Sequence, residues 1–420
     1  MTPILHLTWK SVRNRRLTAG LTVLSVALAV TLLLGVERLR NEARAAFTQT
    51  ISGTDLVVGA RSGPIQLLLY AVFHIGNATN NISWKSYEAL RVHPAVDWAV
   101  PISLGDSHRG YRVVGTDSGF FNHVRYGDGG RVTLAAGRAF DGVFEAVIGA
   151  EVAGRLGYDA GTTIVLAHGA GEVSFAEHAD KPFTVVGVLA RTGTPIDRSV
   201  LVSLAAIEAI HLDWQGGAPI PGVSIAPEHV SKFDLTPKAV TAALVGLKSR
   251  AAVFQAQRFI NEYRDEALLA ILPGATLQEL WSLVGIAEQA LLAVSALVVC
   301  VGLAGLVAVI VAGLGERRRE IAILRALGAG PRDVFVLLAA ESLLLTLAGC
   351  ALGLGLLFAV SALLAPLLEA RFGLSMGLSP PNTNEWIMLG GVVGAGLVAS
   401  VIPGLRAYRM SLADGMTIRV

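Results

Sequence analysis

Charged residues are scarce in this sequence. Of its 420 residues, 16% are charged and 53% are hydrophobic, whereas a soluble domain carries about 25% charged residues. This shortage argues against a wholly soluble protein, and the apolar content argues against a disordered chain. A long polar stretch after residue 36 also argues against a chain made only of membrane spans. We therefore expect a few apolar segments and one sizeable water-exposed domain.

Cysteine is nearly absent, and net charge is small. Cys300 and Cys350 both lie in apolar runs, so the polar region has no disulfide framework. A net charge of +2 implies no strongly charged partner such as nucleic acid. The sequence also lacks a Gly-x-x-x-x-Gly-Lys-Ser/Thr phosphate-binding loop. Together with the lack of a nucleophile beside an evident base, this predicts a protein that is not itself an enzyme.

Four apolar runs are long enough to cross a bilayer, which takes about 20 residues. The first, 17–36, follows the basic residues Lys10, Arg13, Arg15 and Arg16. A cleavable signal peptide is the alternative there, but the run continues past the candidate cleavage sites, which favours an uncleaved anchor. The predicted spans are 17–36, 281–314, 334–368 and 386–405, with an extracytoplasmic α+β domain over 37–280, after an N-terminal amphipathic segment over 1–16.

The basic residues predict the orientation of these spans. They concentrate in the N-terminal segment, in the loop 315–333 and in the tail 406–420, whereas the loop 369–385 carries only Arg371. Cytoplasmic loops are enriched in Lys and Arg. The pattern therefore predicts cytoplasmic termini, a cytoplasmic loop 315–333, an outer loop 369–385 and a multi-pass protein of a bacterial cytoplasmic (inner) membrane.

Within the polar region, short β-branched segments bounded by Gly or Asp predict strands. They are 111–115, 146–149, 162–166 and 183–189. The segments 151–156 and 204–211 predict short helices, 213–237 a connecting loop, and 237–264 a helix with an alanine-rich apolar face.

The loop 315–331 has an amphipathic pattern. Ile321, Leu324 and Leu327 share one face of the predicted helix, Gly328 and Gly330 end it, and Pro331 opens the next one. A basic loop that only enforces topology is one interpretation. An apolar stripe, however, needs a surface to bury against, which favours docking to a partner protein.

The segment Glu316-Arg-Arg-Arg-Glu-Ile-Ala-Ile-Leu-Arg-Ala-Leu-Gly-Ala329 closely resembles the cytoplasmic coupling helix of MacB/FtsX-type ABC transporter permeases. The segment 403–414 resembles the terminal motif of that family, and 55–59, 147–157 and 183–189 resemble parts of its extracytoplasmic domain. The layout of one span, a large domain and three spans is also the family's. The resemblance thus covers nearly the whole chain, and the coupling-helix motif is its most specific part.

This resemblance implies a permease that works as a dimer with a second copy or a paralogue and couples a cytoplasmic ATPase to its periplasmic domain by mechanotransmission. MacB carries its ATPase in the same chain. Without a phosphate-binding loop, this chain resembles instead the LolC/LolE pair and FtsX, with ATP-Mg bound on a separate partner. The docking residues that it implies are Glu316, Arg317, Arg319, Glu320, Ile321, Leu324, Arg325 and Gly328.

Two functions remain open for such a permease. One is export or extraction of an unidentified substrate, and the other is FtsX-like signalling that activates a periplasmic partner without transport. The apolar run 65–75 is too short to span and predicts either a buried core helix or a lipid- or substrate-contacting surface. The contact residues in the second case are Leu67, Leu68, Leu69 and Phe73. That case would favour substrate handling.

Two polar features have simpler interpretations. His168, Glu172, Glu177, His178 and Asp180 could ligate a metal, but their spacing matches no standard zinc pattern, so a polar surface loop is favoured and no metal is predicted. Glu341 lies inside an apolar run. There it could serve as a proton or substrate site, but pairing with a basic residue near the membrane interface is the favoured interpretation.

Overall fold

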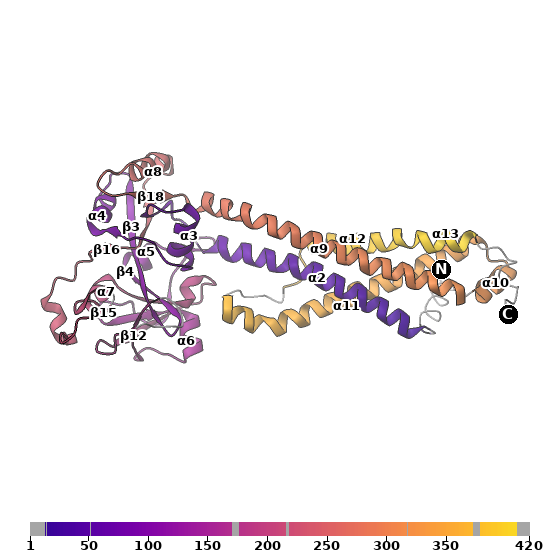
Figure 1. Cartoon of the computed structure of the whole chain (residues 1–420), viewed down its shortest axis with the longest axis horizontal. Coiled ribbons are helices and arrows are strands. Elements are labelled where there is room, and N and C mark those ends of the chain that lie inside the picture. The colour runs from indigo at the N-terminus through magenta and orange to yellow at the C-terminus, as the bar shows by residue number, and fades with distance from the viewer. Residues whose placement is uncertain are drawn as a thin grey trace. The chain divides into compact units, whose positions relative to one another are not determined.

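The chain forms two compact units. A computed structural model describes residues 13, 15–50, 52–169, 176–215, 218–316, 318–372 and 379–409 (Figure 1). One unit comprises Met1–Glu42 and Gly285–Val420, and the other comprises Ala43–Val284. The boundaries between them fall inside two long helices, α2 (Arg16–Gln49) and α9 (Pro273–Glu316).

The first unit is a bundle of apolar helices. Besides parts of α2 and α9 it contains α10 (Arg318–Ala326), α11 (Pro331–Phe372), α12 (Thr383–Ala399) and α13 (Val401–Arg409). Four stretches are long and apolar enough to cross a membrane: Arg16–Ala45, Pro273–Leu314, Pro331–Ala365 and Thr383–Ala407. The expected fold class, with one such helix before the large domain and three after it, is therefore confirmed.

Glycines let α11 approach α2 closely. A Cβ atom added at Gly349 would lie 2.6 Å from Val26 Cγ1, and one at Gly353 would lie 2.7 Å from the Ala27 carbonyl oxygen. Small residues have this role between membrane helices, where close packing drives association. Gly396 of α12 similarly meets Thr346 of α11, whereas a Cβ atom added at Gly355 would have open space, with no atom within 4 Å.

A buried ion pair joins α2 to α12, two helices of the bundle that are far apart along the chain. Arg38 Nε of α2 lies 3.3 Å from Glu385 Oε1 of α12, and both side chains are at most 3% exposed. Arg38 Nη2 also donates to the Ser379 carbonyl oxygen at 2.7 Å, and its guanidinium lies 5.2 Å from the ring centroid of Phe358. Removing one partner of a buried pair costs about 3–5 kcal/mol, so this contact is a strong constraint on the bundle.

The second unit is built on a mixed sheet, whose strands among the described residues are β1 (Leu56–Ala60), β3 (Val96–His108), β4 (Tyr111–Thr116), β7 (Leu134–Gly137), β8 (Glu145–Ile148), β9 (Thr163–Ile164), β10 (Ala167–His168), β11 (Ala176–Glu177), β12 (Phe183–Leu189), β13 (Ser199–Ser203), β17 (Ala242–Leu247) and β18 (Leu268–Ile271). The main order is β18-β1-β17-β3-β4-β13-β8-β12-β7. β3 connects its two halves, because its first part pairs with β17 and its second part with β4 and β10.

Short elements complete this unit. Two-stranded pairs form between β2 (Ile82–Ser83) and β16 (Ala239–Val240), β5 (Arg125–Tyr126) and β6 (Gly130–Arg131), and β14 (Trp214–Gln215) and β15 (Ala218–Pro219). The helices are α3 (Pro64–Phe73), α4 (Trp84–Arg91), α5 (Gly119–His123), α6 (Ala150–Leu156), α7 (Leu204–Ile210), α8 (Val253–Asn261) and the 3₁₀ turns η1 (Pro195–Arg198), η2 (Pro227–Lys232) and η3 (Arg250–Ala252).

The helix predicted over 237–264 is wrong for most of its length. Residues 242–247 form β17, a central strand between β1 and β3, and only Val253–Asn261 is helical. Five of the six β17 residues are buried. A strand covered on both faces has a continuous apolar run, which periodicity alone does not distinguish from a buried helix.

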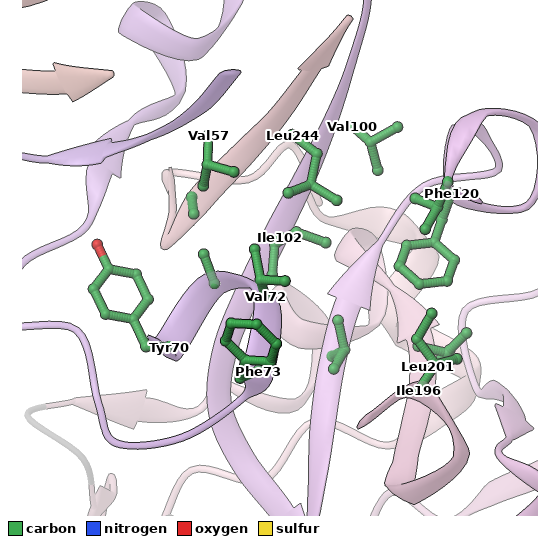
Figure 2. Close-up of a cluster of buried hydrophobic side chains, with 14 of the residues drawn as sticks. Val57, Tyr70, Val72, Phe73, Val100, Ile102, Phe120, Ile196, Leu201 and Leu244 are labelled. Atoms are coloured by element: carbon green, nitrogen blue, oxygen red, sulfur yellow. The ribbon is translucent and has the colours of Figure 1, made fainter. Parts of the chain in front are cut away.

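The apolar run 65–75 is a core helix. Leu67 and Leu68 of α3 are 0% exposed and Phe73 is 4% exposed, and Leu69 packs against the same cluster. Figure 2 shows Tyr70, Val72 and Phe73 among side chains of the sheet such as Val57 and Ile102. Leu67, Leu68 and Phe73 therefore lie in the domain core and Leu69 is partly buried beside it, which favours the core-helix interpretation over a surface that contacts lipid or substrate.

Gly353→Ala tests the close contact between α2 and α11. The added methyl group meets the Ala27 carbonyl oxygen, and such overpacking costs about 1–3 kcal/mol. We expect a lower melting temperature in detergent. Gly355→Ala is the matched control, since its methyl group has open space and alanine favours helix. Equal melting temperatures for the two variants would contradict the contact.

The lowered pKa of the buried His74 predicts that the outer domain loses stability in mild acid. Burial, and then the charge of Arg112, lower the pKa of His74 to about 4, and its Nδ1 lies 3.0 Å from Ser199 Oγ. In the unfolded chain this histidine has a pKa of about 6.5, so the unfolded state binds the proton more tightly than the folded state does. Stability is retained above pH 6.5 and falls as the pH drops from there toward 4. We expect a loss of up to about 2 kcal/mol between pH 7 and 5, measured by thermal unfolding, and a shallower pH dependence in His74→Asn.

Candidate functional site

The predicted coupling segment forms a discrete helix with a defined end. α10 covers Arg318–Ala326, and Gly328 adopts a φ of 99°, a left-handed conformation that glycine accepts without strain. The Ala329 N–H donates to the Leu324 carbonyl oxygen at 3.0 Å, which closes the helix end. Asp333 Oδ2 accepts from the Gly330 N–H at 2.7 Å, and α11 begins at Pro331. The expected helix stop and restart are confirmed.

One apolar residue of α10 anchors it to the bundle. Ile321 is 7% exposed and belongs to an apolar cluster with Leu306, Ile310 and Leu314 of α9 and Val334 and Leu338 of α11. Ala19 of α2 and Ala407 of α13 complete the cluster. Ile321 is thus a structural residue of the bundle, and its side chain is not available to a partner.

The rest of the apolar face of α10 is accessible. Leu327 is 81% exposed and Ile323 is 53% exposed, while Leu324 is half-buried. The predicted face therefore consists of a buried Ile321, a half-buried Leu324 and an exposed Leu327, which directly follows the last residue of α10. Ile323, which the sequence pattern did not single out, adds to the exposed apolar surface.

The remaining predicted docking residues are partly described. Arg317 lies outside the described residues, whereas Glu316 ends α9 and Arg319 and Glu320 lie in α10. Arg325 is half-exposed on the last turn of α10, where a cation complements the helix dipole. The docking role of these residues and of Gly328 stays a prediction.

Glu341 has a basic neighbour. It is 7% exposed and lines a small pocket of the bundle together with Arg15, Thr18, Val309 and Leu345. A buried carboxylate among apolar helices needs such compensation. The pocket therefore supports a structural role for Glu341 over a proton or substrate site.

Two of the histidines predicted as possible ligands come together in the outer domain. His168 and His178 lie in one cluster with Asp106 and His211, which sequence analysis did not select because they are distant along the chain. Glu177 is exposed, Asp180 pairs with Lys181 at 2.8 Å, and Glu172 lies outside the described residues.

The surroundings shift the pKa values of His178 and His168 in opposite directions. Burial, and then the neighbouring His211, lower the pKa of His178 to about 4, so its ring is neutral at pH 7. The hydrogen bond to Asp106 raises the pKa of His168. The cluster therefore contains one buried imidazole that is neutral, His178, and one whose protonated form is stabilised by the Asp106 carboxylate, His168.

Comparisons with known proteins agree with this architecture. The model of the MacB-like periplasmic core domain matches residues 19–262, more than half of the chain. The model of the FtsX-like permease C-terminal region matches residues 292–412, which include α10. No curated protein matches at a significant level.

Two solved structures show distant similarity. The periplasmic region of MacB from Actinobacillus actinomycetemcomitans matches with 11% identity and a TM-score of 0.34, covering 55% of this chain and 94% of that region. The extracellular domain of the noncanonic ABC-type transporter YknZ from Gram-positive bacteria matches with 14% identity and a TM-score of 0.31, covering 52% of this chain and 99% of that domain.

The two family models together cover most of the first span, the outer domain up to residue 262, and residues 292–412 of the spans that follow it. Four apolar helices in the arrangement of one before and three after that domain fit a multi-pass inner-membrane protein. The chain therefore belongs to the MacB/FtsX family and is the permease subunit of an ABC transporter.

Proposed function

We propose that this permease transmits the motion of a separate cytoplasmic ATPase to its periplasmic domain, and that α10 is the docking element. The observation that carries the proposal is the division of the apolar face of α10. Ile321 holds the helix to the bundle, while Leu327 and Ile323 remain exposed. Exposed apolar side chains on a short basic helix suit a groove in a partner protein.

The orientation of α10 follows from charge. The basic residues of 315–333, of the N-terminal segment and of the tail all fall on one side of four spans. That side is cytoplasmic by the positive-inside rule, which is where an ATPase is available. Because the chain lacks a phosphate-binding loop, ATP-Mg binds on the partner, and the permease pairs with a second copy or a paralogue.

A mechanical connection is available within the chain. α2 and α9 each contribute residues to both compact units without a break in the helix. A continuous helix, with a backbone hydrogen bond at almost every residue, is stiffer along its axis than a loop. The buried Arg38–Glu385 pair ties α2 to α12. A shift of the bundle at α10 therefore reaches α2 and α9.

Cargo does not follow from this proposal. Leu67, Leu68 and Phe73 of α3 are buried and supply no surface for lipid or substrate. An exposed apolar run would have favoured substrate handling over FtsX-like signalling, so neither function is favoured by this helix. The coupling step is the same whether motion of the outer domain exports or extracts a substrate or activates a periplasmic partner protein.

Leu327→Asp tests the docking assignment. The side chain is 81% exposed, so the permease should fold normally, but a carboxylate in an apolar interface is costly. We expect the ATPase recovered with the tagged permease from detergent-solubilised membranes to fall at least about tenfold, which corresponds to about 1.4 kcal/mol. Recovery is measured by quantitative mass spectrometry of the co-purified ATPase.

Two further variants separate docking from folding. Val223→Asp places the same charge on an exposed apolar residue of the outer domain and should leave ATPase recovery unchanged. Ile321→Asp buries a charge in the bundle and should lower the melting temperature of the permease itself. Full ATPase recovery with Leu327→Asp would contradict the docking assignment.

A further inference from the structure

Four side chains from separate segments of the outer domain converge on one point. Asp106 comes from β3, His168 from β10, His178 from the turn after β11, and His211 from the residue that ends α7. One potential ligand atom of each lies within 4.8 Å of the others. Asp106 is 2% exposed and His178 is 0% exposed, so half of the cluster is inside the domain.

The distances between these atoms approach those around a bound metal ion. His168 Nδ1 lies 3.1 Å from Asp106 Oδ1 and 3.3 Å from His211 Nε2, and His211 Nε2 lies 3.8 Å from Asp106 Oδ1. A tetrahedral zinc site with bonds of about 2.0–2.2 Å places its ligand atoms about 3.3–3.6 Å apart. These three atoms therefore need only small adjustments to hold such an ion, and the ligand atom of His178 lies within 4.8 Å of each of them.

Hydrogen bonding orients His211 with a lone pair toward the cluster. Its Nδ1 lies 2.7 Å from the Ile207 carbonyl oxygen. A carbonyl oxygen only accepts, so Nδ1 carries the proton and Nε2 of the neutral ring is free to ligate. Metal-bound histidines usually have this second hydrogen bond, which fixes the tautomer and the ring orientation.

Without a metal ion, the facing nitrogen and oxygen atoms of this cluster cannot all be hydrogen-bonded. His168 Nδ1 faces two acceptors, Asp106 Oδ1 and His211 Nε2, and has at most one proton to share between them. A cation at the centre of the cluster would satisfy all three atoms at once.

His178 provides an independent indication. Both of its ring nitrogens are buried and have no hydrogen-bond partner, although leaving a buried polar group unsatisfied costs about 1–3 kcal/mol. Its ring packs 4.2 Å from Trp214 and 5.0 Å from His211, measured between ring centroids. A buried, unpartnered imidazole held beside two other histidines is the arrangement that a metal ion completes.

The surrounding structure holds the four segments in place. Lys181 Nζ lies 2.7 Å from both carboxylate oxygens of Asp213, and Lys181 is fully buried, which links the turn after His178 to the segment after His211. The pairing of β3 with β4 is irregular between Leu104 and Ser107, so Asp106 is opposite His168 of β10. Such irregularities often redirect a side chain at a functional site.

We propose that Asp106, His168, His178 and His211 form a binding site for a divalent transition-metal ion, with Zn²⁺ the expected occupant. Three imidazole nitrogens and one carboxylate oxygen suit Zn²⁺, whereas Mg²⁺ and Ca²⁺ select oxygen ligands. Four protein ligands fill a tetrahedral shell, so the ion would link β3, β10 and the end of α7. The side chains of His168 and His211 are 34% and 27% exposed, which leaves a route for exchange.

Metal titration of the full-length permease tests this site. The protein is purified in detergent, its polyhistidine tag is removed, and it is stripped with a chelator. Zn²⁺ binding is then measured by competition with a chromophoric chelator and by elemental analysis. We expect one Zn²⁺ per chain and an affinity that falls at least about tenfold in His168→Ala and in His211→Ala, since even a change outside the ligand set costs about 10–100-fold.

His229→Ala is the matched control, because His229 is an exposed histidine of the same domain outside the cluster. It should bind Zn²⁺ as the wild type does. Co²⁺ bound to the unsubstituted protein gives a second measurement that does not depend on a variant's folding: intense visible absorption indicates four-coordinate binding. Weak absorption typical of the hydrated ion, or equal Zn²⁺ affinity in wild type and folded His211→Ala, would overturn the proposal.

Discussion

Close packing at glycines, between α11 and α2 and between α12 and α11, is the constraint on which the bundle depends. Lipid is as apolar as the helices that it surrounds, so helix association has to come from close packing and polar contacts. Gly349 and Gly353 supply the packing, because a Cβ at either position would meet Val26 or the backbone of Ala27. The Arg38–Glu385 pair adds a polar contact between α2 and α12. The first turns of α11 contribute Val334 and Leu338 to the cluster around Ile321.

In the proposed function, Ile321 is the residue that connects a short docking helix to the spans on either side of it. A docking helix that only touched solvent and a partner would move without moving the spans. In this segment Ile321 is buried among α2, α9, α11 and α13, whereas Ile323 and Leu327 are exposed. A partner docked in the proposed way would therefore act on packed side chains, which deform little. Gly328, in a left-handed conformation, ends the helix close to Ile321 and so limits its length.

In the outer domain, burial decided between interpretations that the sequence left open. The run 65–75 was compatible with a core helix or a lipid contact, and the sheet covers it. The alanine-rich segment after residue 237 predicted a helix, but pairing with β1 and β3 on either side makes residues 242–247 a strand. Neighbours in space override weak local preference in both cases. The group of potential metal ligands also differs from the one that the sequence indicates. His168 and His178 are near each other along the chain, whereas Asp106 and His211 join them only in the folded domain.

The sequence by itself determined the membrane helices, the stop at Gly328 and the class of protein. Hydropathy, helix ends and family motifs act within a few residues to a few tens of residues, so they can be recognised without neighbours in space. Only the tertiary structure decided which apolar side chains are buried, that Arg38 meets Glu385, and that four ligand-type side chains surround one point. These contacts join segments far apart in the chain, and their stability depends on burial and geometry that exist only once the sheet and the bundle have formed.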